Sequence, residues 1–380
     1  MMPTRPLAIV APNVGTPSET FIHRHVEALY PQRTVVISTL RDNSDPNAYP
    51  GVPRLDPEAV RAPLRSRLRA RIMARLHLPH RPHVQVAVER FILEHGVRVV
   101  LAEYLDWGWR WKWLKERTRV RFYAHAHGYD VSMMLRQREW AERYRELAEM
   151  DGIIAMSNAC ASRLCDLGLP ADRVHVIPYG VELPPDPGSR PRSQAGQVRC
   201  LAVGRMVPKK APIYLLESFR RAHDRWPGLM LDYYGDGPLL AAAMQFVQAS
   251  ELGGAVTLHR AAPNAQVLDA MSRADIFLQH SVVDPLSGDE EGLPVAILEA
   301  MAHGLPVVST RHAGIPEAVE AGRSGHLVEE EDVEGMATHL ESLARDRSAR
   351  EQMGRRGREI VETRFSWERE RKELLSVLGL

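Results

Sequence analysis

The sequence predicts an α/β fold made of two domains, each with a parallel sheet lying between helices. Short apolar runs rich in β-forming residues alternate with helical stretches along the chain, which is typical of parallel sheets. A length of 380 residues exceeds that of one ordinary domain and suits two, each large enough to bury its own core. The composition, 44% hydrophobic and 26% charged, is that of a globular protein.

The first half of the chain contains six predicted strands, separated mostly by helical stretches. After the first strand, Thr16, Pro17 and Glu19 form a capping-box pattern, so we expect a helix to begin at Pro17. The predicted strands are residues 7–12, 33–39, 97–104, 120–128, 151–157 and 173–180.

The second half repeats this alternation after residues 183–197, whose proline-rich composition is that of a linker. We therefore expect one domain over 1–182 and another over 198–364. Two such domains usually bind ligand in the cleft between them, at the carboxyl ends of their strands. The second half is predicted to contain strands at 198–204, 229–235, 255–261, 275–281 and 305–310, helices from about residue 211 and over 264–274, and a hairpin-like turn at 322–328.

The net charge of +1 is unevenly distributed along the chain. Residues 1–182 contain 26 Lys and Arg against 20 Asp and Glu, whereas the remainder contains 23 against 28. This excess of positive charge indicates a polyanionic or membrane-surface partner for the first half. The three cysteines, at 160, 165 and 200, fit a reducing compartment. Since no signal peptide and no apolar run near the roughly 20 residues of a membrane span is present, we expect a cytoplasmic protein.

A basic loop follows the first strand of the second half. Gly204 ends that strand, Arg205 projects from its carboxyl end, and Lys209 and Lys210 come one loop later. Arg chelates oxygens with two N–H groups and Lys supplies a mobile charge, so this cluster suits a diphosphate. The alternative is an exposed loop that happens to be basic.

Two glutamates, Glu291 and Glu299, bracket an apolar segment that begins at Pro294. Proline is well placed to start a helix, whose free N–H groups would form an anion site. The two carboxylates would lie about 12 Å apart if most of the segment is helical. Carboxylates accept hydrogen bonds from paired hydroxyls, so one could bind a sugar and the other a ribose, with phosphates between. The alternative is a solvated pair flanking a core helix.

Several segments resemble a known family. "GRMVPKKAP", "YGDGPLL", "EEGLPVAILEAMAHGLPVVST" and "AGIPEAVEAGRSGHLVEEED" are similar to the carboxyl-terminal domain of family-4 retaining glycosyltransferases, which have the GT-B fold. "PSETFIHRHVEAL" and "HAHGYDVS" resemble the amino-terminal domain of polysaccharide-building members, such as colanic-acid-type transferases. The resemblance covers essentially the whole chain and implies two Rossmann-like domains facing across a cleft. It also implies that residues 365–380 form a helix that crosses back to the first domain.

The resemblance implies a role for each matching residue. The domain 1–182 would bind the acceptor, and the domain 198–364 would bind a nucleotide sugar. His127, Glu291, Arg205 and Lys210 would form the catalytic group, and Asp130, Trp107 and Trp109 are candidates for contacts with the acceptor. The donor would contact Gly15 near the phosphates, Arg205 and Lys210 at the diphosphate, Arg260 and Ala261 along the base, Glu291, Gly292, Leu293 and Pro294 at the sugar and helix start, and Glu299 at the ribose.

The sequence departs from the family in three places. Ala211 stands where many relatives have glycine, residues 311–317 contain one glycine where a pair is common, and the loop after the first strand is poorer in glycine. These departures bear on donor preference more than on activity.

Two other readings of these motifs are disfavoured. Histidines 125 and 127 would point to opposite faces of a strand, so they are poor metal ligands, and no aspartate pair is placed to bridge a metal and a diphosphate. We therefore expect metal-independent transfer with no cofactor. Leu240 stands where a dinucleotide fingerprint would need its third glycine, which argues against a dehydrogenase.

Two surface-like stretches remain open to more than one interpretation. Residues 61–81 carry seven arginines, no acid and an apolar residue every fourth position, so a helix here would either dock its stripe on its own domain or lie on an anionic membrane at the inner face. The four tryptophans of "DWGWRWKW" either pack in the core or serve as an acceptor platform or interfacial anchor.

The sequence thus predicts a retaining hexosyltransferase that uses a UDP- or GDP-linked sugar and a hydroxyl of a glycan or lipid-linked glycan. No nucleic-acid partner is expected. The alternatives are a transferase for a small natural-product or inositol-like acceptor, a non-catalytic nucleotide-sugar-binding subunit, and an epimerase of the same fold.

Overall fold

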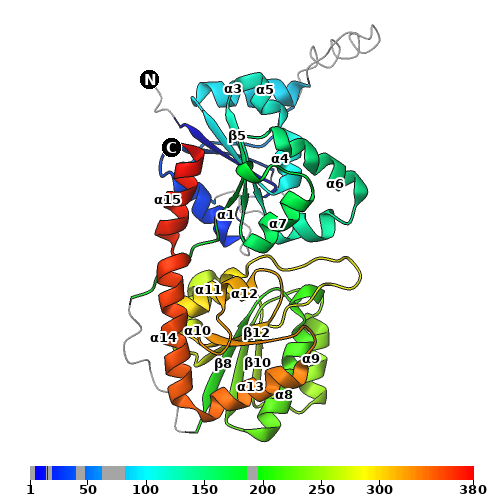
Figure 1. Ribbon diagram of the computed structural model, residues 1–380, viewed down its shortest axis with the longest axis vertical. Coiled ribbons are helices and arrows are strands. Elements are labelled where there is room, and N and C mark those ends of the chain that lie inside the picture. The colour runs from blue at the N-terminus through cyan, green and yellow to red at the C-terminus, as the bar shows by residue number, and fades with distance from the viewer. Residues whose placement is uncertain (1–4, 14, 16–18, 40–47, 62–81, 186–195) are drawn as a thin grey trace.

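The computed structural model contains two parallel sheets, one in each half of the chain (Figure 1). It describes residues 5–13, 15, 19–39, 48–61, 82–185 and 196–380. Each sheet places its first strand next to its fourth, the order of the doubly wound Rossmann-like fold. The predicted α/β class with two Rossmann-like domains is therefore confirmed.

The amino-terminal sheet has the strand order β3-β2-β1-β4-β5-β6-β7. Its central strands are mostly apolar and are buried along their whole length, as parallel sheets covered by helices require. Its strands are β1 Leu7–Ala11, β2 Thr34–Ser38, β3 Arg54–Leu55, β4 Val99–Glu103, β5 Arg121–Ala126, β6 Gly152–Ala155 and β7 Val174–Val176. Its helices are α1 Thr20–Arg24, α3 His83–Glu94, α4 Leu105–Trp111, α5 Trp113–Thr118, α6 Arg138–Arg145 and α7 Asn158–Asp166, with π-helical turns η1 His25–Leu29 and η2 Asp130–Met134 and 3-10 turns η3 Glu146–Glu149 and η4 Ala171–Arg173.

The carboxyl-terminal sheet has the order β10-β9-β8-β11-β12-β13. Its strands are β8 Val198–Val203, β9 Leu229–Tyr234, β10 Val256–His259, β11 Ile276–Leu278, β12 Val307–Thr310 and β13 Gly325–Val328. Its helices are α8 Pro212–Arg225, α9 Leu240–Ala249, α10 Asn264–Arg273, α11 Val295–Ala302, α12 Ile315–Ala318, α13 Val333–Arg345 and α14 Arg347–Arg364, with a 3-10 turn η5 Pro208–Lys210.

The last helix, α15 Trp367–Leu378, lies against the amino-terminal domain, whereas α14 lies along the carboxyl-terminal one (Figure 1). Trp367, Leu374 and Leu378 are buried in a core shared with β1 and η1. The chain therefore crosses between the domains twice. At the crossing, Val181 donates its N–H to the carbonyl of Phe365 at 2.8 Å and accepts one from Trp367 at 3.0 Å.

Two local predictions are wrong. The segment 322–328 turns back at Gly322, but β13 then joins β12 in parallel, so it is no hairpin. A Cβ on Gly325 would lie 2.2 Å from the carbonyl oxygen of Val307, so this approach requires glycine. Helix α1 begins at Thr20 and not at Pro17, and Glu19 accepts a hydrogen bond from the Tyr104 hydroxyl at 2.9 Å. Thr16 and Pro17 lie outside the described residues.

In the described part of the chain, no helix combines the length and the apolar character needed to cross a bilayer. The arginine-rich stretch falls almost wholly at 62–81, outside the described residues, and its two interpretations stay predictions.

Candidate active site

The predicted site residues lie in loops that leave the carboxyl ends of strands in both sheets. Gly15 follows β1 and has a φ of 73°, a left-handed conformation that favours glycine. His127 follows β5, and Arg205 and Lys210 follow β8. Glu291 precedes α11, which begins after Pro294 as predicted. Both sheets thus direct their loops toward the interface between the domains.

An ion pair joins two of the predicted residues. The Nζ of Lys210 lies 2.5 Å from Oε2 of Glu291, and both side chains are largely buried. The lysine stem packs beside Gly204, where an added Cβ would lie in ordinary van der Waals contact with it at 3.5 Å. Burial opposes the charge of Glu291, but Lys210, Lys209 and Arg205 overcome it and lower the pKa of Glu291 to about 2. Burial also lowers the pKa of Lys210, against the opposing pull of Glu291.

The loop that carries Glu291 contacts both domains. The N–H of Glu290 donates to the Ser132 hydroxyl at 3.1 Å, and its carboxylate accepts from Arg163 at 2.6 Å. A Cβ on Gly128 would lie 2.6 Å from the backbone nitrogen of Gly292, so the two loops touch through backbone atoms. The turn that holds His127 therefore lies directly against the Glu291 loop.

Lys209 bonds the loop just before Glu291, whereas its neighbour Lys210 pairs with Glu291 itself. Lys209 is 7% exposed, and its Nζ donates to Asp289 and to the carbonyl of Glu290, each at 3.0 Å. The same loop is held from the other side by His312, whose Nε2 accepts the Glu291 N–H at 3.0 Å while its Nδ1 bonds Glu330 at 2.6 Å. These contacts fix the loop on which Glu291 stands.

His127 is 4% exposed, and both of its ring nitrogens have partners. Its Nε2 lies 3.1 Å from Glu103 and its Nδ1 lies 2.5 Å from the Tyr179 hydroxyl. Burial, together with the charge of His125, lowers the pKa of His127 to about 4. The ring is therefore neutral near pH 7.

The prediction that His125 and His127 face opposite ways is wrong. Strand alternation ends with β5 at Ala126, and both rings reach the same Glu103 oxygen, at 3.3 Å and 3.1 Å. The nitrogens of His25 and His125 and the oxygen of Glu103 lie within 4.8 Å of one another, as metal ligands would. However, His25 Nδ1 is 2.6 Å from Glu103, a hydrogen-bond distance, whereas two ligands of one zinc ion lie roughly 3.3 Å apart. Hydrogen bonding therefore accounts for the contact between His25 and Glu103.

Among the residues predicted to bind the donor, several on the carboxyl-terminal domain are more exposed to solvent. Arg205, Arg260 and Ala261 are exposed, and the Arg260 guanidinium lies 3.5 Å from Asp236. Glu299 projects from α11 toward Asn264, whose side-chain amide donates at 3.4 Å, and burial raises the pKa of Glu299. Gly292 is partly exposed, and Leu293 is buried under the helix start.

The three acceptor candidates have different surroundings. Asp130 is fully buried and accepts the His127 N–H at 2.8 Å, so it stabilises that turn. Trp107 is 6% exposed and packs in the core with Trp111, as the core-packing interpretation expects. Trp109 is half-buried, stacks on Arg143 at 4.5 Å and donates to Glu146 at 3.1 Å. Their contact with an acceptor stays a prediction.

Several residues of this site were missed by sequence reasoning. Glu103 had a local signal, since it is an acid at the carboxyl end of an apolar strand. His25 and Glu370, which bond each other at 3.1 Å, are 345 residues apart and had none. Tyr179, Arg163 and His312 likewise owe their places to the fold.

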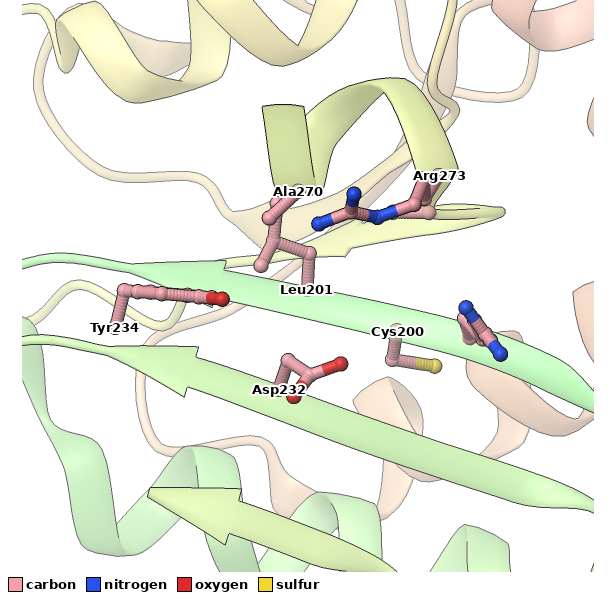
Figure 2. A pocket seen from close by; sticks show the side chains of 8 residues that line it. Cys200, Leu201, Asp232, Tyr234, Ala270 and Arg273 are labelled. Carbon is pink, nitrogen blue, oxygen red and sulfur yellow. The ribbon is translucent and has the colours of Figure 1, made fainter. Parts of the chain in front are cut away.

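A cavity of about 40 Å³ lies elsewhere, between β8, β9 and α10 (Figure 2). Leu201 and Ala270 face each other across it, with Arg273 alongside. This volume is too small for a nucleotide, since ligand pockets usually span roughly 300–1,000 Å³. The cavity lining contains none of the predicted site residues: Arg199, Cys200, Leu201, Asp232, Tyr234, Ala270, Arg273 and Ala274.

Comparisons with known proteins agree with this geometry. The family model described as Glycosyltransferase Family 4 matches residues 18–183, and that described as Glycosyl transferases group 1 matches residues 190–360. The chain is 31% identical over 251 residues to a putative colanic acid biosynthesis glycosyltransferase of Salmonella typhimurium, covering 66% of this chain and 62% of the relative. It is 31% identical over 235 residues to an amylovoran biosynthesis glycosyltransferase of Erwinia amylovora, covering 62% and 57%. The chain thus spans less than two thirds of the length of these relatives.

A solved structure shares the fold over nearly the whole chain. The Anabaena protein HepE, in complex with UDP and glucose, superposes with a TM-score of 0.77 over 98% of this chain and 99% of its own, at 17% identity. The chain therefore belongs to the glycosyltransferases of GT-B fold, with a family 4 domain followed by a group 1 domain.

Proposed function

We propose that this protein is a retaining hexosyltransferase of polysaccharide biosynthesis. It takes a UDP- or GDP-linked sugar as donor and a hydroxyl of a glycan or lipid-linked glycan as acceptor. The observation that supports this most strongly is the Lys210–Glu291 pair at the domain interface, with Arg205 nearby and the His127 turn against the same loop.

The pair offers one partner to each part of a nucleotide sugar. A diphosphate would take Lys210 and Arg205, and the released Glu291 carboxylate would accept hydrogen bonds from sugar hydroxyls. The N–H groups at the start of α11 add positive potential for the phosphates. Glu299 would accept from the ribose.

The transfer breaks the bond between the anomeric carbon and the diphosphate oxygen and forms one to the acceptor oxygen on the same face. The acceptor proton passes to the departing phosphate, because His127 has both ring nitrogens occupied by buried partners. Stabilising the charge of the leaving diphosphate would be the largest contribution to the rate. This chemistry requires no metal or cofactor.

Calorimetric titration with UDP and with GDP, in the presence of a chelator, tests the proposal. Micromolar binding of one nucleotide, absent in a Lys210→Ala variant, is the expected result and identifies the base. Binding of neither nucleotide, or binding only after manganese is restored, contradicts the metal-independent donor site.

A further inference from the structure

His25 is an interior cation between two carboxylates. Its side chain is 0% exposed, with Nδ1 at 2.6 Å from Glu103 Oε1 and Nε2 at 3.1 Å from Glu370 Oε1. Carboxylates only accept, so both ring nitrogens donate, which requires the protonated imidazolium. Burial lowers the pKa of His25, but the charges and hydrogen bonds of Glu103 and Glu370 outweigh it and raise the pKa to about 9. The only other ionisable ring stacked on it among the described residues is His125, at 5.5 Å.

The two carboxylates continue to the site and to the domain crossing. The other oxygen of Glu103 accepts from His127, which in turn accepts from the Tyr179 hydroxyl. The other oxygen of Glu370 accepts the backbone N–H of Gly180 at 2.7 Å. Because residues 179 and 180 are consecutive, these five hydrogen bonds close a ring.

This ring lies where the chain passes between the domains. Gly180 is followed by Val181, which is paired with Ser366. A Cβ on Gly180 would lie 2.5 Å from the Ser366 carbonyl oxygen, so the two crossing segments are in backbone contact. Gly180 and Glu370 therefore stand next to the two segments by which the chain passes between the domains, and their hydrogen bond ties those segments together.

We propose that His25 is a positioning residue that couples the domain crossing and helix α15 to His127. It holds Glu103 and Glu370 together, Glu103 holds the His127 ring, and the His127 turn supports the Glu291 loop through the Gly128–Gly292 contact. The expected effect on kcat rests on the proposed glycosyl transfer. The expected effect on the His127 ring rests only on the ring of hydrogen bonds.

Three variants test the coupling: His25→Gln, Glu370→Gln and, as a matched control on the same helix, Glu373→Gln, whose carboxylate bonds the exposed Arg369. In the first two variants we expect kcat to fall about tenfold or more, because small misplacements of a reacting group are costly, with the donor KM within about twofold. In Glu370→Gln the alkaline limb of kcat moves to lower pH, because one of the carboxylates that retains the His25 proton is lost. The control keeps the wild-type profile.

Nitrogen-15 spectra of the histidine rings provide a readout that needs no turnover, with His127 assigned from a His127→Asn variant. The wild type should show His25 doubly protonated at pH 8 and His127 as the neutral Nε2–H tautomer, and Glu370→Gln should shift the His127 resonances although the two residues are not in contact. Unchanged His127 resonances in Glu370→Gln, or an unmoved alkaline limb in a folded variant, overturn the coupling. If the wild type binds neither UDP nor GDP while Glu370→Gln still shifts the His127 resonances, the proposed function is overturned and the coupling is supported.

Discussion

At the scale of single residues, the Lys210–Glu291 ion pair is the central feature of the proposed donor site. Each side chain is buried enough that its charge depends on the other. Removing one partner leaves a desolvated charge behind, which costs more than the pair itself contributes.

Changing Lys210 to Ala is expected to lower turnover by orders of magnitude, because the leaving diphosphate loses its buried cation. Steady-state kinetics with the nucleotide sugar identified by titration would measure this. The control is Lys372→Ala on the exposed side of α15. Near-normal turnover of the Lys210 variant would refute the phosphate role.

A second residue-scale feature is Ala211, one of the positions where the sequence departs from its family. Its φ of 40° and ψ of 53° are left-handed, which explains why glycine is common there. The strain of an alanine in this conformation exceeds the entropic cost of a glycine.

Ala211→Gly is therefore expected to stabilise the protein by about 0.5–1 kcal/mol, the difference between these two effects. Urea denaturation followed by circular dichroism measures the free energy of unfolding. Ala242→Gly, on the exposed face of α9, should do the opposite and destabilise by about 1 kcal/mol. A loss of stability in the Ala211 variant would contradict the strain argument.

At the scale of elements, the sequence located most strands and helices to within a few residues. The apolar strands at 7–11, 99–103 and 307–310 and the helix after Pro294 agree with the predictions because their signals are local. The errors arise where an element ends. Strand β5 stops before His127, and β13 leaves its turn to pair with a strand that no local pattern specifies.

The contact between the two crossing segments belongs to this scale as well. Gly180→Ala places a methyl group 2.5 Å from a backbone oxygen of the other segment, so one segment must shift. We expect a loss of about 1–3 kcal/mol in stability, as for other overpacked sites, and reduced turnover. Gly253→Ala, with nothing within 4 Å of its added carbon, is the matched control and should be close to neutral. If both variants have the same melting temperature, the crossing segments can shift to accommodate the added methyl group.

At the scale of the whole molecule, the domains are held together across the site. Arg163 on α7 bonds Glu290 at 2.6 Å, and Glu317 accepts from Asn158 at 2.8 Å. These contacts close the interface around Glu291, which would exclude water while the sugar is transferred.

Glu290→Gln removes the charge from this closure while keeping the side-chain shape. We expect the free energy that favours domain closure to fall by about 1 kcal/mol, as for a moderately exposed ion pair. Hydrolysis of the donor should then rise relative to transfer. Product analysis with and without acceptor measures the ratio of hydrolysis to transfer. The control is Glu351→Gln, which removes a carboxylate that pairs with Arg347 on the surface of α14. A wild-type ratio in the Glu290 variant would show that this ion pair does not govern closure.

The sequence by itself determined the α/β class, the two domains, the basic loop at 205–210 and the helix that follows Pro294 and carries Glu299. These follow from periodicity, strand ends and helix starts, which act over a few neighbouring residues. Only the tertiary structure decided that Lys210 pairs with Glu291, that His127 is enclosed by Glu103 and Tyr179, and that His25 joins them to Glu370. Those contacts depend on strand order and on how α15 crosses the domains, and burial then sets the charge of each group.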